Sequence, residues 1–200
     1  MGPHMDRADR IRELTEHSDL HERLRSVPPA ARIRGLYFKS TIAVLTEAGK
    51  LDEYRELFTE NYSAMSWFPM TDYLERLAVG AALLTSPKDI DAGLYEIGRS
   101  NAAAFAESLL GRMMIRLLSK DPQKLLRQAC ASRRQSVEYG RWSVEFGPER
   151  TAVIHMREEY IWIASNLTGA AKGTFESIGL DASVDYTLAG PYEGTHIIRW

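Results

Sequence analysis

Apolar residues recur every three or four positions along the first two thirds of the chain, whereas they alternate with polar residues along most of the last third. The change falls near Gln135. The first spacing is typical of amphipathic helices, and the second is typical of strands with one buried face. The pattern therefore predicts a single α+β domain, with a helical part over residues 29–135 and a mixed part over residues 136–200.

The helical part divides into five predicted helices. Apolar spacing places them over residues 33–48, 51–58, 73–84, 90–119 and 122–129. Ser86-Pro87 and Asp121-Pro122 each supply an N-cap followed by proline at the first helical position, which is a helix start signal. Residues 67–69 interrupt the helical spacing, so we expect a linker there.

Residues 1–28 are expected to contribute little to the fold. Residues 2–5 look like the remnant of a cleaved tag, so we assign them no role. Residues 6–25 are strongly charged and carry few apolar positions, which predicts a weak helix or a weakly ordered arm. Pro28 and Pro29 then interrupt the segment, and we expect the folded domain to begin there and to span residues 29–200.

The mixed part is predicted to form a four-stranded antiparallel sheet in ββαββ order. Alternating apolar and polar residues place strands over 140–146, 152–156, 182–188 and 196–200. Short turns join the first strand to the second and the third to the fourth, so each pair is predicted to be a hairpin.

A helix over residues 158–178 is predicted between the two hairpins. We place two adjacent carboxylates, Glu158 and Glu159, in the first turn of this helix, because the macrodipole favours negative charge at a helix N-terminus. Gly169 and Gly173 lie one turn apart along it. Because glycine has no side chain, we expect these two positions to let the helix lie tightly on the sheet.

Composition narrows the class of protein. The 200 residues carry 25 Lys and Arg against 27 Asp and Glu, a net charge of -2, which gives no basic excess for binding nucleic acid. A single cysteine, Cys130, excludes an internal disulfide and a cysteine-based zinc cluster. No apolar run approaches the roughly 20 residues that span a bilayer. We therefore expect a cytoplasmic protein that needs no metal or other cofactor to fold.

Several short motifs follow one another in a fixed order after Pro28, namely Gly35-Leu36-Tyr37-Phe38, Phe68-Pro69 before Tyr73-Leu74, Ile97-Gly98-Arg99, Gly111-Arg112 and the terminal Trp200. In these motifs and in length, the chain resembles a paralogous family of myxobacterial proteins built on a domain of unknown function. That family is distantly similar to a fold group containing haem-nitric-oxide-binding domains, vinyl-reductase-type ligand-binding domains and TRAPP vesicle-tethering subunits. The resemblance implies a helical bundle before a small antiparallel sheet, and it implies sensing, ligand binding or scaffolding.

A haem sensor of this group would have an axial histidine on a helix of the body and a Tyr-x-Ser-x-Arg motif that binds the propionates. The sequence has no histidine between His21 and His155. Tyr139-Gly140-Arg141 has the wrong spacing for the motif and lacks the serine. We therefore predict no cofactor, and a haem or other cofactor-based gas or redox sensor is the second hypothesis.

Two sets of side chains are candidates for binding. In the fold group, a ligand cavity lies between the bundle and the sheet when one is present, and aromatic residues from both halves are candidates for lining it: Trp67, Phe105, Trp142, Trp162 and Tyr186. Arginines on the long helix are candidates for an anionic-ligand or partner surface: Arg99, Arg112 and Arg116. The alternatives are an ordinary filled core for the first set and a solvated helix face, paired with Glu96 and Glu107, for the second.

Three other residues have both a chemical and a structural interpretation. Cys130 could be a nucleophile or an acylation point, but no neighbouring histidine lowers its pKa, so a half-buried helix position is favoured. His155 with Glu158 and Glu159 superficially suggests a metal or acid-base cluster, and here too the structural interpretation is favoured. His196 follows the apolar phase of its strand, which is typical of a hydrogen-bonded core histidine.

No reaction emerges from these residues, since they include no nucleophile–base pair and no paired carboxylates on one element. The sequence therefore predicts a non-enzymatic cytoplasmic signalling or adaptor module. We expect it to act as a homodimer and to bind either a protein partner or an apolar small molecule. A cofactor-based sensor comes second, and an enzyme comes third.

Overall fold

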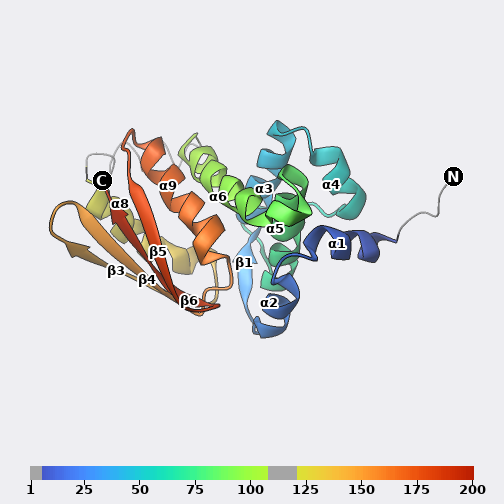
Figure 1. Ribbon diagram of the computed structural model, residues 1–200, viewed down its shortest axis with the longest axis horizontal. Coiled ribbons are helices and arrows are strands. Elements are labelled where there is room, and N and C mark those ends of the chain that lie inside the picture. Colours follow the sequence, from blue (N-terminus) through green and yellow to red (C-terminus); the bar gives the residue numbers. More distant parts are fainter. Residues whose placement is uncertain (1–5, 108–120) are drawn as a thin grey trace.

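The computed structural model describes residues 6–107 and 121–200, without the side chains of residues 102–107. The first part of the chain is helical, as predicted. Its helices are α1 (Arg7–Thr15), α2 (Leu20–Ser26), α3 (Gly35–Glu47), α4 (Leu51–Leu57), α5 (Met70–Leu84), α6 (Ile90–Glu107) and α8 (Pro122–Ser136), and a 3₁₀ turn, η1 (Pro87–Asp89), precedes α6. Figure 1 shows α1 to α5 on one side of the molecule and the sheet on the other.

The last part of the chain forms the predicted four-stranded antiparallel sheet. Its strands are β3 (Arg141–Gly147), β4 (Thr151–Arg157), β5 (Ser183–Gly190) and β6 (Glu193–Arg199), and their order across the sheet is β3-β4-β6-β5. Val144 lies opposite Ile154, and Ile154 lies opposite His196. Because opposed residues share a face, the alternation seen in the sequence correctly identified the covered face of the sheet.

Helix α5 is the centre of the helical part. Buried residues lie on all sides of this helix, which is typical of a helix enclosed by other elements. Tyr73, Leu74 and Leu77 are at most 1% exposed. Helices α1, α2, α3, α4 and α6 all contact α5, so the bundle is built around it.

Two short strands were not predicted. Strand β1 (Arg32–Arg34) pairs antiparallel with β2 (Trp67–Pro69), and Ile33 lies opposite Phe68. Ile33 is therefore in a strand and not in the first turn of the predicted helix, and residues 67–69 are a strand and not a linker. A strand of three residues is too short to show an alternation that differs from helical spacing. The pairing of these two strands depends on contacts between residues that are distant in the sequence.

The charged N-terminal segment is more ordered than we expected. Residues 6–26 contain two helices, α1 and α2, and their few apolar residues are well placed, since Leu14 and Leu20 are only 3% and 4% exposed. Arg23 is also buried, and its Nη1 donates to the carbonyl oxygen of Tyr160 at 3.0 Å. Tertiary contacts thus compensate for a composition that favours disorder.

The helix between the hairpins begins later than we predicted. Residues 158–162 form no helix; a π-helical turn, η2 (Ile163–Leu167), leads into α9 (Thr168–Ser177). The macrodipole interpretation of Glu158 and Glu159 is therefore wrong. Glu158 has a positive φ of 53°, and Glu159 is completely buried. A buried carboxylate must have partners, and these lie far away in the sequence.

Gly169 and Gly173 face a helix and not the sheet. A methyl group at Gly169 would overlap the carbonyl oxygen of Tyr95, and one at Gly173 would overlap that of Arg99. From the other side, a methyl group at Gly98 would overlap the carbonyl oxygen of Asn166. Helices α6 and α9 therefore pack backbone against backbone, as their side-by-side placement in Figure 1 indicates. Gly98 thus permits a close approach of the two backbones.

Candidate functional site

A hollow lies within the helical part, between α3 and α4. Three side chains of α3 (Lys39, Ile42 and Ala43), three of α4 (Leu51, Tyr54 and Arg55) and the segment 58–62 line it. Its volume is about 640 Å³, which is within the range of small-molecule sites. The wall is mainly apolar, so the hollow suits a ligand with a hydrocarbon body.

The chain builds this hollow with a short helix followed by an irregular segment. Helix α4 has only seven residues, and Phe58 after it adopts an extended conformation, so the helix ends there. Tyr54 and Phe58 contact each other with ring centroids 5.0 Å apart. Farther along, the Tyr62 ring stacks on Phe38 of α3 at 4.0 Å. These aromatic contacts attach the segment to α4 at one end and to α3 at the other.

Two residues that line the hollow carry buried hydroxyl groups without partners in the described part of the chain. The hydroxyl oxygens of Tyr54 and Tyr62 are buried and have no hydrogen-bond partner among the described residues. The Nε atom of Arg76, on α5, is also buried and has no hydrogen-bond partner among these residues. Burial raises the pKa of Tyr62 to about 12, so this phenol stays protonated and can donate. Buried polar groups without partners are uncommon and often mark a site for water or a ligand.

Charges of both signs line the hollow. Lys39 of α3 and Arg55 of α4 are exposed. The carboxylate of Glu60 also lines the hollow, but it is 2.8 Å from Arg76 Nη2 and is therefore neutralised. Arg76 is itself 5% exposed and lies over the Phe58 ring at 4.6 Å. Within the described residues, Lys39 and Arg55 form no ion pair, and neither do the carboxylates of Asp52 and Glu56 on α4.

A second polar cluster joins α8 to the sheet, and the sequence did not predict it. Glu159 is fully buried and forms an ion pair with Arg133, which is 8% exposed. The Trp142 indole donates to Glu159 Oε2 at 2.8 Å, and the Ile161 amide donates to Oε1 at 2.9 Å. The Arg133 guanidinium also lies over the Trp142 ring at 4.3 Å. Every oxygen of this carboxylate has a partner, so the cluster is structural and offers no open position to a substrate.

Of the five aromatic residues predicted to line a cavity, the four with described side chains lie in separate environments. Trp142 belongs to the Glu159 cluster, while the Trp162 indole donates to Asp19 Oδ1 at 2.7 Å. Trp67 lies on β2 beneath the Arg34 guanidinium, at 3.8 Å. Tyr186 is 47% exposed on the edge strand β5, and the Phe105 side chain is outside the described residues. None of the four described side chains lines the hollow between α3 and α4.

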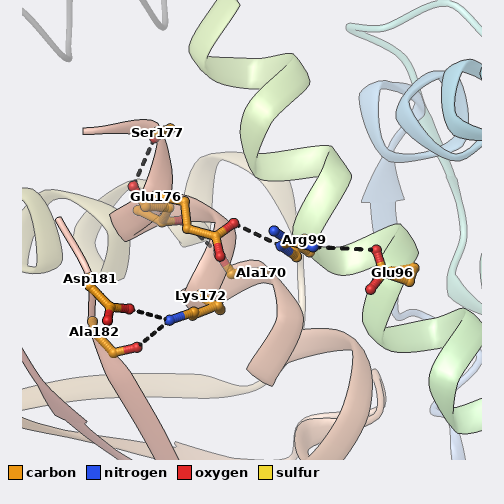
Figure 2. Close-up of polar contacts among 9 residues, drawn as sticks. Glu96, Arg99, Ala170, Lys172, Glu176, Ser177, Asp181 and Ala182 are labelled. Atoms are coloured by element: carbon orange, nitrogen blue, oxygen red, sulfur yellow. Dashed lines mark hydrogen bonds and ion pairs between the residues drawn. The ribbon is translucent and has the colours of Figure 1, made fainter. Parts of the chain in front are cut away.

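Of the three arginines predicted to form an anionic-ligand or partner surface, the structure describes Arg99; Arg112 and Arg116 lie outside the described residues. Figure 2 shows Arg99 between two carboxylates, with Nε 2.7 Å from Glu176 and Nη1 3.8 Å from Glu96. On the same helix as Glu176, Lys172 reaches Asp181 at 2.6 Å. Arg99 is thus engaged in a surface ion-pair network that links α6 to α9, as the solvated-face alternative predicted for Glu96.

Cys130 and His196 match the structural interpretation of the sequence. Cys130 is partly buried on α8, and burial raises the pKa of its thiol to about 11, which opposes the reactive thiolate. His196 is 2% exposed, and its Nε2 lies 3.0 Å from the carbonyl oxygen of Ile163 and 3.1 Å from Thr168 Oγ1. Burial lowers the pKa of this imidazole, so the neutral form is favoured.

Haem, which the fold group implies, does not fit the described side chains. An iron porphyrin needs an axial donor that faces a cavity. His196 is hydrogen-bonded inside the core, and His155 is partly exposed on β4, 3.7 Å from Glu145. In the hollow, the donor-type side chains are Tyr54 and Tyr62, and burial raises the pKa of each and so opposes the phenolate that binds iron.

The described residues contain neither a metal-binding group of side chains nor a membrane-spanning helix. Over residues 6–107 and 121–200, we find no group of three His, Cys, Asp or Glu side chains that could hold a metal ion. No helix in these ranges is both long enough and apolar enough to cross a bilayer.

Solved H-NOX structures share this fold. An unliganded Fe(II) H-NOX variant from K. algicida is similar with a TM-score of 0.64 and 16% identity, covering 84% of this chain and 96% of that chain. An H-NOX protein from S. oneidensis in the Fe(II)NO state has a TM-score of 0.61 and 10% identity, covering 84% of this chain and 98% of that chain. At such low identities the likeness shows the fold alone.

Sequence comparison shows the family. No curated protein matches the chain. A family model described as protein of unknown function (DUF2378) matches residues 27–200, which is most of the chain and includes both the helical part and the sheet. The predicted kinship to a domain of unknown function, with distant similarity to haem-nitric-oxide-binding domains, is thereby confirmed. The chain belongs to the DUF2378 family and has an H-NOX-like α+β fold.

Proposed function

We propose that this protein is a non-enzymatic signalling module that binds an apolar small molecule in the hollow between α3 and α4. The observation that carries the proposal is the hollow itself, which encloses about 640 Å³ behind a mainly apolar wall. An apolar surface of this kind is stabilised when a ligand removes it from water. Binding would couple α3 to α4, and both helices contact α5 at the centre of the bundle.

A haem-based gas sensor is the second candidate, because the solved structures of similar fold are H-NOX proteins. The side chains count against it. No histidine stands between His21 and His155, and the tyrosines of the hollow are held in the protonated form by burial. We therefore expect the purified protein to be colourless and to give no saturable Soret shift when haem is added.

The test uses a neutral apolar dye, N-phenyl-1-naphthylamine, whose fluorescence increases in an apolar environment. We expect saturable binding to the wild-type chain. Ala43 lines the hollow and is exposed, so Ala43→Trp should fill the space without removing any core side chain, and it should weaken dye binding about tenfold or more.

The matched control is Ala131→Trp, which places the same side chain on an exposed position of α8, away from the hollow. It should leave dye binding unchanged. Equal binding by both variants, or no saturable binding by the wild type, would contradict the proposed site. A Soret band in the protein as purified would instead favour the haem sensor.

A homodimer in the cytoplasm is part of the proposal. Support comes from the edge strand β5, whose Tyr186 and Leu188 are 47% and 51% exposed. Exposed apolar side chains on an edge strand favour pairing with a second chain. Light scattering coupled to size-exclusion chromatography gives the mass in solution, and a monomer at micromolar concentration would contradict the dimer while leaving the ligand site untouched.

A further inference from the structure

We infer that two copies of this chain associate through their β5 strands, which pair antiparallel and join the two four-stranded sheets into one continuous sheet. This inference rests on the homodimer of the proposed function and adds the surface and the register of the contact. Thr187 lies on the twofold axis between the two strands, so that Tyr186 of each copy lies opposite Leu188 of the other.

The outer edge of β5 is the first argument. Strand β5 is the last strand of the sheet, and among the described residues only β6 pairs with it. An edge strand has backbone N–H and C=O groups that face no other strand, so it can pair with a further chain. Proline and lysine on an edge oppose such pairing, and the eight residues of β5 include neither. The irregularity in its pairing with β6 lies near its end, between Leu188 and Gly190.

The side chains of β5 are the second argument. Tyr186 and Leu188 are two of the four large apolar residues that are exposed in the described part of the chain. Both lie on the covered face of the sheet, because Tyr186 is opposite His196 and Leu188 is opposite Gly194. A twofold axis perpendicular to the sheet keeps this face on the same side in both copies. The apolar side chains of the two strands therefore meet, and part of their exposed surface leaves water.

The charge of β5 determines the register. Asp185 is the one charged residue of this strand, and it forms an ion pair with Arg199 on β6. A twofold axis at Asp185 would place two carboxylates directly opposite each other, which destabilises a strand pair. An axis at Thr187 separates the two Asp185 residues by four positions along the strands. It also places the aromatic ring of Tyr186 opposite the aliphatic side chain of Leu188 on both sides of the axis, which is a stabilising pair in sheets.

The opposite edge of the sheet lacks these features. Strand β3 carries two exposed charged residues, Arg141 and Glu145, and it has no exposed large apolar residue. Charged side chains on an edge strand disfavour pairing with a second chain. The two edges of the same sheet therefore differ, and the difference favours β5 as the contact.

The first experiment places a charge at the centre of the contact. In the full chain, Thr187→Lys would put two ammonium groups opposite each other at the axis, so we expect it to raise the dissociation constant of the dimer about tenfold or more. Ser143→Lys is the matched control, because Ser143 occupies the same row of the sheet on the other edge: Thr187 is opposite Thr195, Thr195 is opposite His155, and His155 is opposite Ser143. It should leave the dissociation constant unchanged.

Light scattering coupled to size-exclusion chromatography over a series of protein concentrations measures both constants. Thr187 and Ser143 are exposed, so circular dichroism should show an unchanged fold for each variant.

The second experiment tests the register by cross-linking. In a chain that carries Cys130→Ala to remove the native thiol, Thr187→Cys should form a disulfide between two copies when copper phenanthroline is added as the oxidant. Directly opposed residues of antiparallel strands have Cα atoms about 5 Å apart, which a disulfide can bridge. In the same background, Asp185→Cys should stay unlinked, because its two copies would lie more than about 10 Å apart. Ser143→Cys should also stay unlinked.

The outcomes separate the strand pairing from the homodimer. A wild-type chain that is monomeric would overturn both. A dimer that Thr187→Lys leaves intact, or that Ser143→Lys weakens equally, would overturn the pairing of β5 strands and leave the homodimer standing. A dimer in which Asp185→Cys is cross-linked, or Thr187→Cys is not, would overturn the register. Binding of the dye to the hollow is measured separately and depends on none of these results.

Discussion

At the scale of single residues, the most informative contact is the buried ion pair of Glu159 with Arg133. Removing two charges from water is expensive, and the pair persists because hydrogen bonds from Trp142 and Ile161 complete the coordination of the carboxylate. These partners come from α8, β3 and the loop before η2. A single side chain thus joins three elements of the molecule.

We expect Glu159→Gln to lower the free energy of unfolding by about 3 kcal/mol, because Arg133 would remain buried without a counter-charge. Urea denaturation followed by circular dichroism measures this value. Glu193→Gln is the matched control, since it breaks an exposed pair with Arg157 and should cost less than about 1 kcal/mol. Equal effects of the two variants would mean that the buried pair contributes no more than a surface pair.

At the scale of elements, the contact between α6 and α9 determines how the bundle meets the sheet part. Gly98 on α6 and both Gly169 and Gly173 on α9 lie where any side chain would overlap the other helix's backbone. The surface pair of Arg99 with Glu176 connects the same two helices from outside, as Figure 2 shows. Close packing, and not the ion pair, is the main stabilising contribution, because exposed pairs contribute little.

Gly98→Ala tests this packing, because the sign of the change in the free energy of unfolding depends on it. In an unconstrained helix, replacing glycine by alanine stabilises by about 1 kcal/mol. Here the new methyl group would overlap the Asn166 carbonyl oxygen, so we expect thermal unfolding to show a loss of about 3 kcal/mol or more. Gly190→Ala is the control, because nothing lies within 4 Å of a methyl group built at that position. A stabilised Gly98→Ala variant would contradict the packing described for α6 and α9.

At the scale of the whole molecule, the N-terminal helices connect to the other end of the fold. Arg23 of α2 donates to the carbonyl oxygen of Tyr160, which is 137 residues away in the sequence, and its guanidinium lies over the Trp162 ring at 4.6 Å. Asp19 accepts from the Trp162 indole and pairs with Arg23. Residues 6–26 therefore connect the bundle to the loop that carries Glu159.

We expect Arg23→Gln to lower the free energy of unfolding by about 2 kcal/mol, because a buried hydrogen bond and the contact with Trp162 are lost. Arg25→Gln, on the exposed side of the same helix, should change stability by less than about 0.5 kcal/mol. Guanidinium denaturation followed by tryptophan fluorescence measures both. If the arm were weakly ordered, as its composition suggested, the two variants would unfold alike.

Much of the fold could be predicted from the sequence because its signals are local. The alternation from Trp142 to Phe146 and from Ala152 to Met156 requires only period-two spacing, and it correctly indicated the hairpin and its buried face. The cap at Asp121 is equally local, since its side chain accepts from the amide of Lys124 three residues later. The structural roles of Cys130 and His196 followed from the same kind of reasoning.

The remaining features depend on residues that are distant in the sequence. The pairing of Ile33 with Phe68, the burial of Glu159 beside Arg133 and the anchoring of Arg23 each join segments at least 26 residues apart. The hollow could not be found in advance for the same reason. Lys39, Tyr54 and Arg55 carry no motif, and a filled core and a lined cavity have the same apolar pattern.

The sequence by itself determined the class of fold, the ββαββ order and the buried face of the sheet, because hydrophobic periodicity and capping act between neighbouring residues. The spaces between helices and the pairing of charges depend on contacts that appear only in the folded molecule. Those properties arise from packing and electrostatics between distant segments. They place the proposed ligand site between α3 and α4, and not at the boundary between bundle and sheet, where the glycines of α6 and α9 bring two backbones into contact.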